Sequence, residues 1–156
     1  MSISATLENF LRSKGSQYEV VQHPLTHNSI ETAEMAHIPG DRLAKTVLLE
    51  DEHGYVAAVL PSTHHIWLSE LCEKVGRGLT LADESEIREL FKDCDAGAVP
   101  PVGSAYGMQT YLDESLTRQP DIYFEAGDHQ ALIHMQIGQF LEMMDSAERV
   151  RCAHRI

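Results

Sequence analysis

The sequence predicts an α+β fold with a mixed sheet, in a single domain over residues 1–156. Segments with the period of helices and segments with the period of strands are intermixed along the whole chain. Several of the strands nevertheless follow one another directly, with no helix between them. The chain contains no internal repeat, low-complexity segment or linker, and 156 residues suit one domain with a sizeable core.

Five segments are expected to be helices because their apolar residues recur at helical spacing and a capping or breaking residue marks an end. In the first segment Leu7, Phe10 and Leu11 form one apolar stripe, and Gly15 ends it. Asp83 is expected to cap the fourth. In chain order the helices are expected at residues 4–15, 29–37, 67–75, 83–91 and 138–145.

Seven short segments bounded by turn residues are expected to be strands. Two of them form a hairpin around the turn at residues 51–54. In chain order the strands are expected at residues 18–22, 44–50, 55–60, 79–81, 109–112, 121–125 and 131–136.

The charge balance limits the partners of the protein. Twelve basic and 24 acidic residues give a formal net charge of −12, which argues against broad nucleic-acid binding, because phosphate contacts need clustered lysine and arginine. The basic residues are scattered except for a small group at Arg149, Arg151 and Arg155. A nucleic-acid partner would therefore have to be held locally, at one end.

Nothing in the sequence indicates a membrane span or export. No apolar run approaches the ~18 residues of a span, and the first residues lack the basic-then-apolar pattern of a secretory signal. The three cysteines, Cys72, Cys94 and Cys152, have unrelated spacings that imply neither a disulfide framework nor a zinc site. We therefore expect a cytoplasmic protein with no membrane partner.

The stretch 95–107 is the most informative part of the chain, because it holds three glycines and two consecutive prolines yet is neither polar nor repetitive. Proline fixes φ and glycine permits close backbone approach, so the stretch predicts a rigid apolar loop with well-placed amides. Such amides can hold a carbonyl oxygen or an oxyanion without reorganisation. The alternative interpretation is a tight structural corner between two elements.

Lys45 is the second unusual feature. Alternation along the strand at 44–50 places Lys45 on one face with Val47 and Leu49, so that this face is otherwise apolar. One interpretation is a lysine at the strand end whose stem packs on apolar surface and whose ammonium reaches water. The functional interpretation is a cation at the rim of an apolar cavity, placed for a phosphate or a developing negative charge.

Three segments taken together carry a resemblance to a known family: residues 44–49 around Lys45, residues 97–101 (GAVPP), and residues 124–129 (FEAGDH). In this order and spacing they resemble the YbaK family, which includes the editing domain of bacterial prolyl-tRNA synthetases and its free-standing relatives. The resemblance extends from the helix at residue 4 to the helix ending near residue 145. It implies a mostly antiparallel, barrel-like sheet flanked by helices, and hydrolysis of the ester of wrongly charged aminoacyl-tRNA.

The resemblance also implies site residues. Lys45 corresponds to the signature lysine, and residues 97–101 correspond to the G-x-x-x-P loop. Lys45 would hold the phosphate of the terminal adenosine or the carbonyl of the amino acid. The amides of Gly97, Ala98 and Val99 would cradle the carbonyl oxygen.

Four further residues complete the expected site. Pro100 and Pro101 cannot donate, but they fix the geometry of the loop. His129 stands where several relatives carry a histidine or another polar residue, and with Tyr106 it is expected to contact the substrate. The resemblance further implies help from the substrate's own ribose hydroxyl, and we expect no cofactor and no metal.

The sequence is therefore interpreted as a free-standing aminoacyl-tRNA deacylase that acts in trans and serves translation fidelity. Its expected partner is the acceptor end of a mischarged tRNA, for example alanine on proline tRNA or a related small amino acid. Either a synthetase or an elongation factor would deliver it, or the mischarged amino acid itself would direct binding. An acyl ester is already activated, so its hydrolysis needs a positioned water and an oxyanion hole more than a strong nucleophile.

Other interpretations remain open at this point. A catalytically silent module could use the same pocket for an aminoacyl group, a nucleotide or a partner protein. A small-molecule ester or amide hydrolase would act equally well on a minimal aminoacyl ester. Cys94 could be a nucleophile, and His23 with His27 could contribute to a metal site, although no metal-binding motif occurs.

Overall fold

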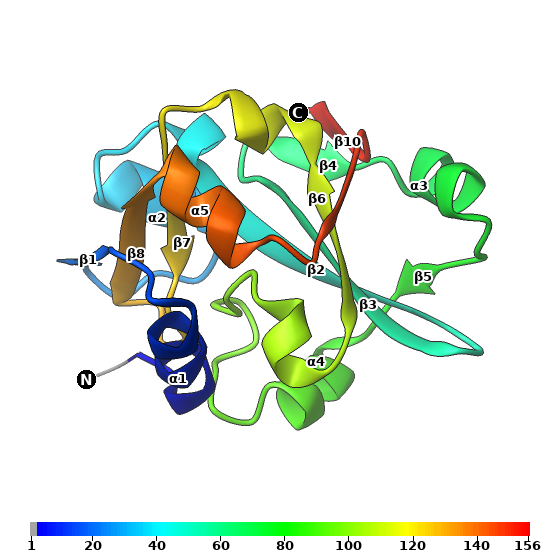
Figure 1. Cartoon of the computed structure of the whole chain (residues 1–156), viewed down its shortest axis with the longest axis horizontal. Coiled ribbons are helices and arrows are strands. Elements are labelled where there is room, and N and C mark those ends of the chain that lie inside the picture. Colours follow the sequence, from blue (N-terminus) through cyan, green and yellow to red (C-terminus); the bar gives the residue numbers. More distant parts are fainter. Residues whose placement is uncertain (1–2) are drawn as a thin grey trace.

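The computed structural model describes residues 3–156, and a mixed sheet of eight strands crosses its centre (Figure 1). Among the described residues, antiparallel pairs of strands outnumber parallel pairs, of which there are three. The predicted α+β class with a mixed, mostly antiparallel sheet is confirmed. In sheet order the strands are β1 (Glu19–Gln22), β8 (Ala131–Gln136), β7 (Asp121–Glu125), β2 (Leu43–Asp51), β3 (Gly54–Pro61), β6 (Gln109–Asp113) and β9 (Glu148–Val150), and β5 (Thr80–Leu81) pairs with β2.

Five helices lie at the positions that the sequence predicts. They are α1 (Ala5–Lys14), α2 (Ser29–Met35), α3 (Leu68–Val75), α4 (Glu84–Leu90) and α5 (Ile137–Met143). Side chains of Ser4, Asn28 and Asp83 accept hydrogen bonds from the first turns of α1, α2 and α4, so each helix begins where a capping residue stands. Three short 3-10 turns complete the set: η1 (Gly40–Arg42), η2 (Gly103–Tyr106) and η3 (Glu114–Arg118).

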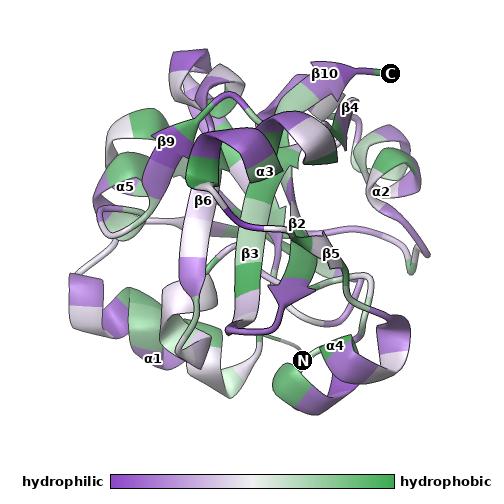
Figure 2. Cartoon of the chain, turned by 90° about the vertical axis from the view of Figure 1, so that its right-hand side faces the viewer, coloured by the Kyte–Doolittle hydropathy of each residue, from purple (hydrophilic) through white to green (hydrophobic). Residues whose placement is uncertain are grey.

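The helices pack on the sheet through apolar faces. Helices α1 and α5 cover β7 and β8, where Leu11, Phe124 and Phe140 are completely buried. Helix α3 packs through Leu71 on the β2–β3 hairpin. Figure 2 shows hydrophobic residues along β3, in the middle of the molecule. In the order of the sheet, β2 is an interior strand, with β7 on one side and β3 on the other.

Three short strands were not expected from the sequence. Strand β9 pairs with β6, while β4 (His64–Ile66) and β10 (Ala153–Arg155) form a separate antiparallel pair. A three-residue strand is too short to show a hydrophobic period, so the sequence has no signal for it. Within residues 3–156, no helix has the length and apolar character that crossing a bilayer requires.

Candidate active site

Lys45 lines a small cavity of about 180 Å³ beside the middle of the sheet. Three parts of the chain form its walls: the start of β2, the segment that leads into α2, and the glycine–proline loop, with Glu125 at the end of β7. The lining residues are His27, Asn28, Ser29, Ala44, Lys45, Thr46, Ala96, Gly97, Val99 and Glu125. The fold thus brings Lys45 and the loop together, although more than fifty residues separate them in the chain.

Lys45 lines this cavity, and its ammonium has no ionic partner within residues 3–156. No carboxylate oxygen within residues 3–156 lies within 4.0 Å of its Nζ, in contrast to the exposed pairs such as Lys14 with Asp145 at 2.7 Å. Burial lowers the pKa of Lys45 below its ordinary value of 10.5. A half-buried, unpaired cation is costly to keep, and its position favours a function over a structural role.

The backbone of the glycine–proline loop is ordered by two hydrogen bonds. The Asp95 N–H donates to the Gly127 carbonyl at 2.7 Å, and the Ala98 N–H donates to the Asp95 carbonyl at 2.9 Å. The Ala98 amide is therefore already occupied. No hydrogen bond from the N–H of Gly97 or Val99 to another part of the described chain is found, and both residues line the cavity.

The two prolines of the loop lie behind the cavity wall and do not reach the cavity. Pro100, Pro101 and Ala98 are buried. Their rings fix φ on the side of the loop that faces the core. They support the geometry of Gly97 and Val99 from within the protein.

His129 packs its ring against Gly97. A Cβ placed on Gly97 would lie 2.8 Å from both Cε1 and Nε2 of the His129 ring and 3.3 Å from the carbonyl oxygen of His27. His129 adopts φ 61°, which is uncommon outside glycine and follows Gly127 at φ 122°. The Asp128 carboxylate holds this turn by accepting the N–H groups of residues 130 and 131, both at 2.9 Å.

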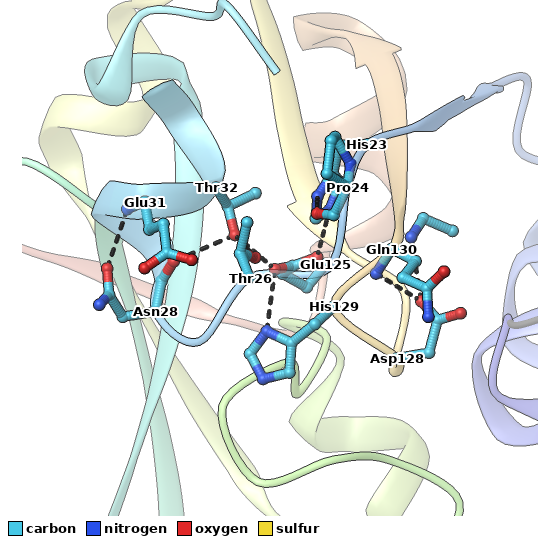
Figure 3. A network of polar contacts seen from close by, with 11 residues as sticks. His23, Pro24, Thr26, Asn28, Glu31, Thr32, Glu125, Asp128, His129 and Gln130 are labelled. Atoms are coloured by element: carbon cyan, nitrogen blue, oxygen red, sulfur yellow. Dashed lines mark hydrogen bonds and ion pairs between the residues drawn. The ribbon is translucent and has the colours of Figure 1, made fainter. Parts of the chain in front are cut away.

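Glu125 also belongs to this site, although no role was expected for it from the sequence. Its carboxylate is buried and contacts three side chains, two of which come from distant segments of the chain (Figure 3). His23 Nε2 lies 3.2 Å from Oε1, Thr32 Oγ1 donates to Oε2 at 3.0 Å, and His129 Nδ1 lies 3.5 Å from Oε2. The sequence signals were its place in the segment 124–129 that carries the family resemblance and a carboxylate at the last position of a largely apolar strand.

The tautomer of His23 follows from its second contact. Its Nδ1 lies 2.7 Å from the Pro24 carbonyl, which can only accept, so Nδ1 carries a proton. The contact between Nε2 and Oε1 of Glu125 then requires one more proton, held either by the imidazole or by the carboxyl group. Burial raises the pKa of Glu125, and His23, the Thr32 hydroxyl and His129 offset part of that rise.

Two other residues that the sequence analysis considered lie apart from the cavity. The Tyr106 hydroxyl donates to Asp93 Oδ1 at 2.8 Å and lies 3.4 Å from Cys94 Sγ, while its ring packs on Phe91 at 4.4 Å. Burial raises the pKa of the Cys94 thiol to about 11. At neutral pH this thiol is protonated, which does not favour Cys94 as a nucleophile.

A wider groove adjoins the cavity on the other side of Gly97. Its volume is about 730 Å³, and it shares His27, Ala96 and Gly97 with the cavity. Its lining also includes His129, the ion pair of Arg88 with Glu84 at 2.8 Å, Lys92, Cys94 and Asp95. Within residues 3–156, no group of three or more His, Cys, Asp or Glu side chains is placed to hold a metal ion.

Comparison with known proteins gives a family and several structural relatives. The sequence model of the family described as "Aminoacyl-tRNA editing domain" matches residues 23–143. Three solved structures share the fold, each with a TM-score of 0.83. Comparison with curated proteins found no match.

The three structures differ in how they are described. One is a candidate trans-editing enzyme for prolyl tRNA synthetase, 24% identical, with 96% of this chain and 95% of that chain covered. Another is a hypothetical protein, 21% identical, with 96% and 99% covered. The third is a scaffold for the presentation of linear epitopes, 22% identical, with 97% and 96% covered.

Proposed function

This chain belongs to the aminoacyl-tRNA editing domain family, and from that premise we propose that it is a trans-editing deacylase. It hydrolyses the ester that joins a wrong amino acid to the terminal ribose of a tRNA. The observation that carries the proposal is the cavity that the unpaired Lys45 shares with the amides of Gly97 and Val99.

The size of the cavity favours a substrate that carries a small amino acid. Its volume of about 180 Å³ is below the roughly 300–1,000 Å³ of sites for drug-sized ligands. Alanine or serine suits such a space better than an aromatic amino acid. We therefore propose alanine on proline tRNA, or a related small amino acid, as the substrate.

The reaction needs charge stabilisation more than a nucleophilic side chain. The oxygen of a water adds to the ester carbonyl carbon, and the carbonyl oxygen becomes an oxyanion. Lys45 and the N–H groups of Gly97 and Val99 stabilise that oxyanion. The bond to the ribose oxygen then breaks, and this oxygen takes the proton that the water gives up. The products are the free amino acid and a tRNA with an intact terminal ribose.

The groups at the end of β7 hold the rest of the amino acid. The α-ammonium of the substrate needs an anion, and Glu125 is the carboxylate that lines the cavity. His129 closes the cavity against Gly97, where it contacts the amino acid or the ribose. The neighbouring ribose hydroxyl of the substrate helps to position the water.

The adjoining groove accommodates the terminal adenosine. It opens from the cavity at Gly97 and is large enough, at about 730 Å³, for a nucleoside. Lys92 at its edge supplies positive charge for the phosphate of that nucleotide. The tRNA is therefore engaged from its acceptor end, and a synthetase or an elongation factor delivers it.

A deacylation panel tests this proposal. Purified protein is mixed with tRNAs that carry alanine, serine, threonine or cysteine in place of the cognate amino acid, and released amino acid is measured against buffer. We expect one or a few of the small amino acids to be released far above the buffer rate. Release of none, together with binding of the same tRNAs, would instead indicate a catalytically silent binding module. Equal rates on full tRNA and on a minimal aminoacyl ester would indicate a small-molecule hydrolase.

A further inference from the structure

The cations of this acidic protein divide into paired and unpaired ones. Among the twelve lysines and arginines, seven have a carboxylate within 4.0 Å. Within residues 3–156, no such partner is found for Lys45, Lys92, Arg118, Arg149 and Arg151. Cations that the protein leaves unpaired, against 24 acidic residues, are the ones available to an external anion.

Arg118 and Arg151 line one hollow of about 300 Å³, although 33 positions separate them in the sequence. The hollow is lined by residues of η3 and β10, and Figure 1 shows β10 at the top of the view, next to the C-terminus. Arg155, His64 and His154 also line it. We call this set of five residues the arginine surface.

The acidic groups around the hollow are mostly committed to internal contacts. The buried Asp113 carboxylate accepts the Cys152 N–H at 2.9 Å through Oδ1, and accepts the Ser115 N–H and hydroxyl through Oδ2. Asp41 accepts from Arg155 at 2.8 Å. Glu114 remains as an exposed carboxylate at the edge. The two unpaired guanidinium groups therefore keep their charge for a ligand.

An aromatic platform adjoins the same surface. The Trp67 ring stacks on the His154 ring, with centroids 5.6 Å apart and planes 17° apart. The Arg151 guanidinium lies over the Trp67 ring, 5.7 Å from its centroid. Arginine held over an aromatic ring keeps a fixed orientation, which suits contact with a phosphate oxygen.

The arginine surface lies next to the strands that carry Lys45. In the β2–β3 hairpin Lys45 is opposite Leu60, and Ala44 is opposite Pro61. A second hollow, of about 240 Å³, is lined by Pro61 together with His64, Arg118 and Arg155. His64 follows Leu60 by four residues, which span at most about 14 Å of chain. A nucleic acid whose end occupies the Lys45 cavity can thus reach the arginine surface.

We propose that the arginine surface binds backbone phosphates of the tRNA acceptor stem while the terminal ester occupies the Lys45 cavity. The inference rests on the proposed deacylase function and adds the surface that distinguishes a full tRNA from a short ester. Arg118 and Arg151 make the principal contacts. Their phosphate contacts carry no sequence information, so they position the acceptor end without selecting a tRNA.

The test compares two double variants with the same loss of charge. Arg118→Gln/Arg151→Gln removes the two unpaired guanidinium groups of the surface. Arg12→Gln/Arg149→Gln is the control, because it removes two exposed arginines, one of them also unpaired, outside the hollow. All four side chains are exposed, so both proteins are expected to fold, and thermal melts verify this.

Each protein is assayed on a full mischarged tRNA and on the same amino acid esterified to a CCA trinucleotide. We expect the test variant to lose about tenfold in kcat/KM per arginine on the full tRNA, as for hydrogen bonds to charged groups. Its activity on the trinucleotide ester should stay at the wild-type level. The slope of the logarithm of the tRNA binding constant against the logarithm of the salt concentration should become shallower, by an amount that corresponds to about two phosphate contacts.

Equal losses on both substrates, or equal losses in the control variant, would overturn the inference. Unchanged tRNA binding in the test variant would also overturn it and would point to an acidic protein as the partner of this surface. An absence of deacylation by wild-type protein on every substrate would instead refute the proposed function. Binding of a non-hydrolysable aminoacyl-tRNA still measures the arginine surface in that case.

Discussion

Replacement of Lys45 by methionine should separate the catalytic contribution of this side chain from its effect on folding. Methionine keeps a flexible apolar stem of similar length and removes the charge. Burial lowers the pKa of Lys45, and no carboxylate within residues 3–156 lies within 4.0 Å of its ammonium. The charge therefore destabilises the fold and is expected to be kept for the reaction, so the variant should gain stability while it loses activity.

The size of the catalytic effect follows from the proposed role. Loss of one preorganised group that stabilises an oxyanion reduces kcat by about 10²- to 10³-fold, or about 2.7–4 kcal/mol. We therefore expect Lys45→Met to deacylate at least about 100-fold more slowly than wild type. Single-turnover deacylation of the mischarged tRNA that the wild type hydrolyses fastest measures this, because it is not limited by product release.

The sign of the stability effect follows from the direction of the pKa shift. Since the folded state holds the lysine proton less tightly than the unfolded chain, the ammonium opposes folding at neutral pH. This cost diminishes as the pH rises from the lowered pKa of the folded state toward 10.5, where the unfolded lysine loses its proton. The melting temperature of Lys45→Met should exceed that of wild type at pH 7, and the difference should shrink toward pH 10.5.

Thermal melts at several pH values measure this difference. In a chain of this size 1 kcal/mol corresponds to about 2–4 °C, so a rise of a few degrees is measurable. Lys14→Met is the control, because Lys14 is ion-paired with Asp145 at 2.7 Å and its loss should not raise the melting temperature. A Lys45→Met variant that melts cooperatively and deacylates at the wild-type rate would refute the catalytic assignment. A variant that melts at a lower temperature would show that Lys45 is structural.

Four further predictions concern the same site. Gly97→Ala should reduce deacylation by about 10²-fold with little loss of stability, because its Cβ would lie 2.8 Å from the His129 ring and 3.3 Å from the His27 carbonyl oxygen, so that the loop has to shift together with the amides of Gly97 and Val99; a wild-type rate in a kinetic assay would contradict this. His129→Ala should lower the deacylation rate about fivefold, as expected for the loss of one hydrogen bond of about 1 kcal/mol, and should change the preference among aminoacyl-tRNAs. Unchanged rates across the deacylation panel would assign His129 a structural role. Glu125→Gln should keep the fold, by circular dichroism, and lower kcat/KM about 30-fold or more, since a buried charge partner of the substrate is lost; equal activity would exclude contact with the ammonium. The log–log salt slope for a non-hydrolysable aminoacyl-tRNA should correspond to about two to four neutralised phosphates, against roughly 6–10 for strongly basic binders; a steep slope in a titration would indicate a more extended basic surface.

The parts of the fold that could be predicted are those with a local signal. The helix at α1 has an apolar stripe and a terminal glycine within ten residues, and the β2–β3 hairpin is bounded by its own turn. Strands β4, β9 and β10 have three residues each, so neither periodicity nor composition marks them. Their pairing depends on segments that are distant in the sequence.

The candidate site divides in the same way. Lys45 and the loop at 97–101 could be identified because a charge on an apolar strand face and a glycine–proline run are both unusual in themselves. Glu125 could not, because His23 and Thr32, which give it its surroundings, lie 102 and 93 positions away. Tyr106 belongs to the same loop in sequence, but its hydroxyl turns toward Asp93, and no local pattern predicts that direction.

Two of the cavity's walls, strand β2 and the segment at residues 24–28 that leads into α2, are held by different kinds of hydrogen bond. Strand β2 is held by backbone ladders to β3 and β7. Residues 24–28 instead connect to the protein through the His23 imidazole, the Thr26–Thr32 hydroxyl pair at 2.6 Å and the cap at Asn28. Within residues 3–156, no backbone hydrogen bond from the N–H groups of residues 25–28 is found.

This difference separates the two walls in their dynamics. Amide protons of residues 25–28 should exchange with solvent through local opening, whereas those of β2 should exchange only when the sheet itself unfolds. We expect this wall, and not β2, to be the one that moves when a substrate end enters.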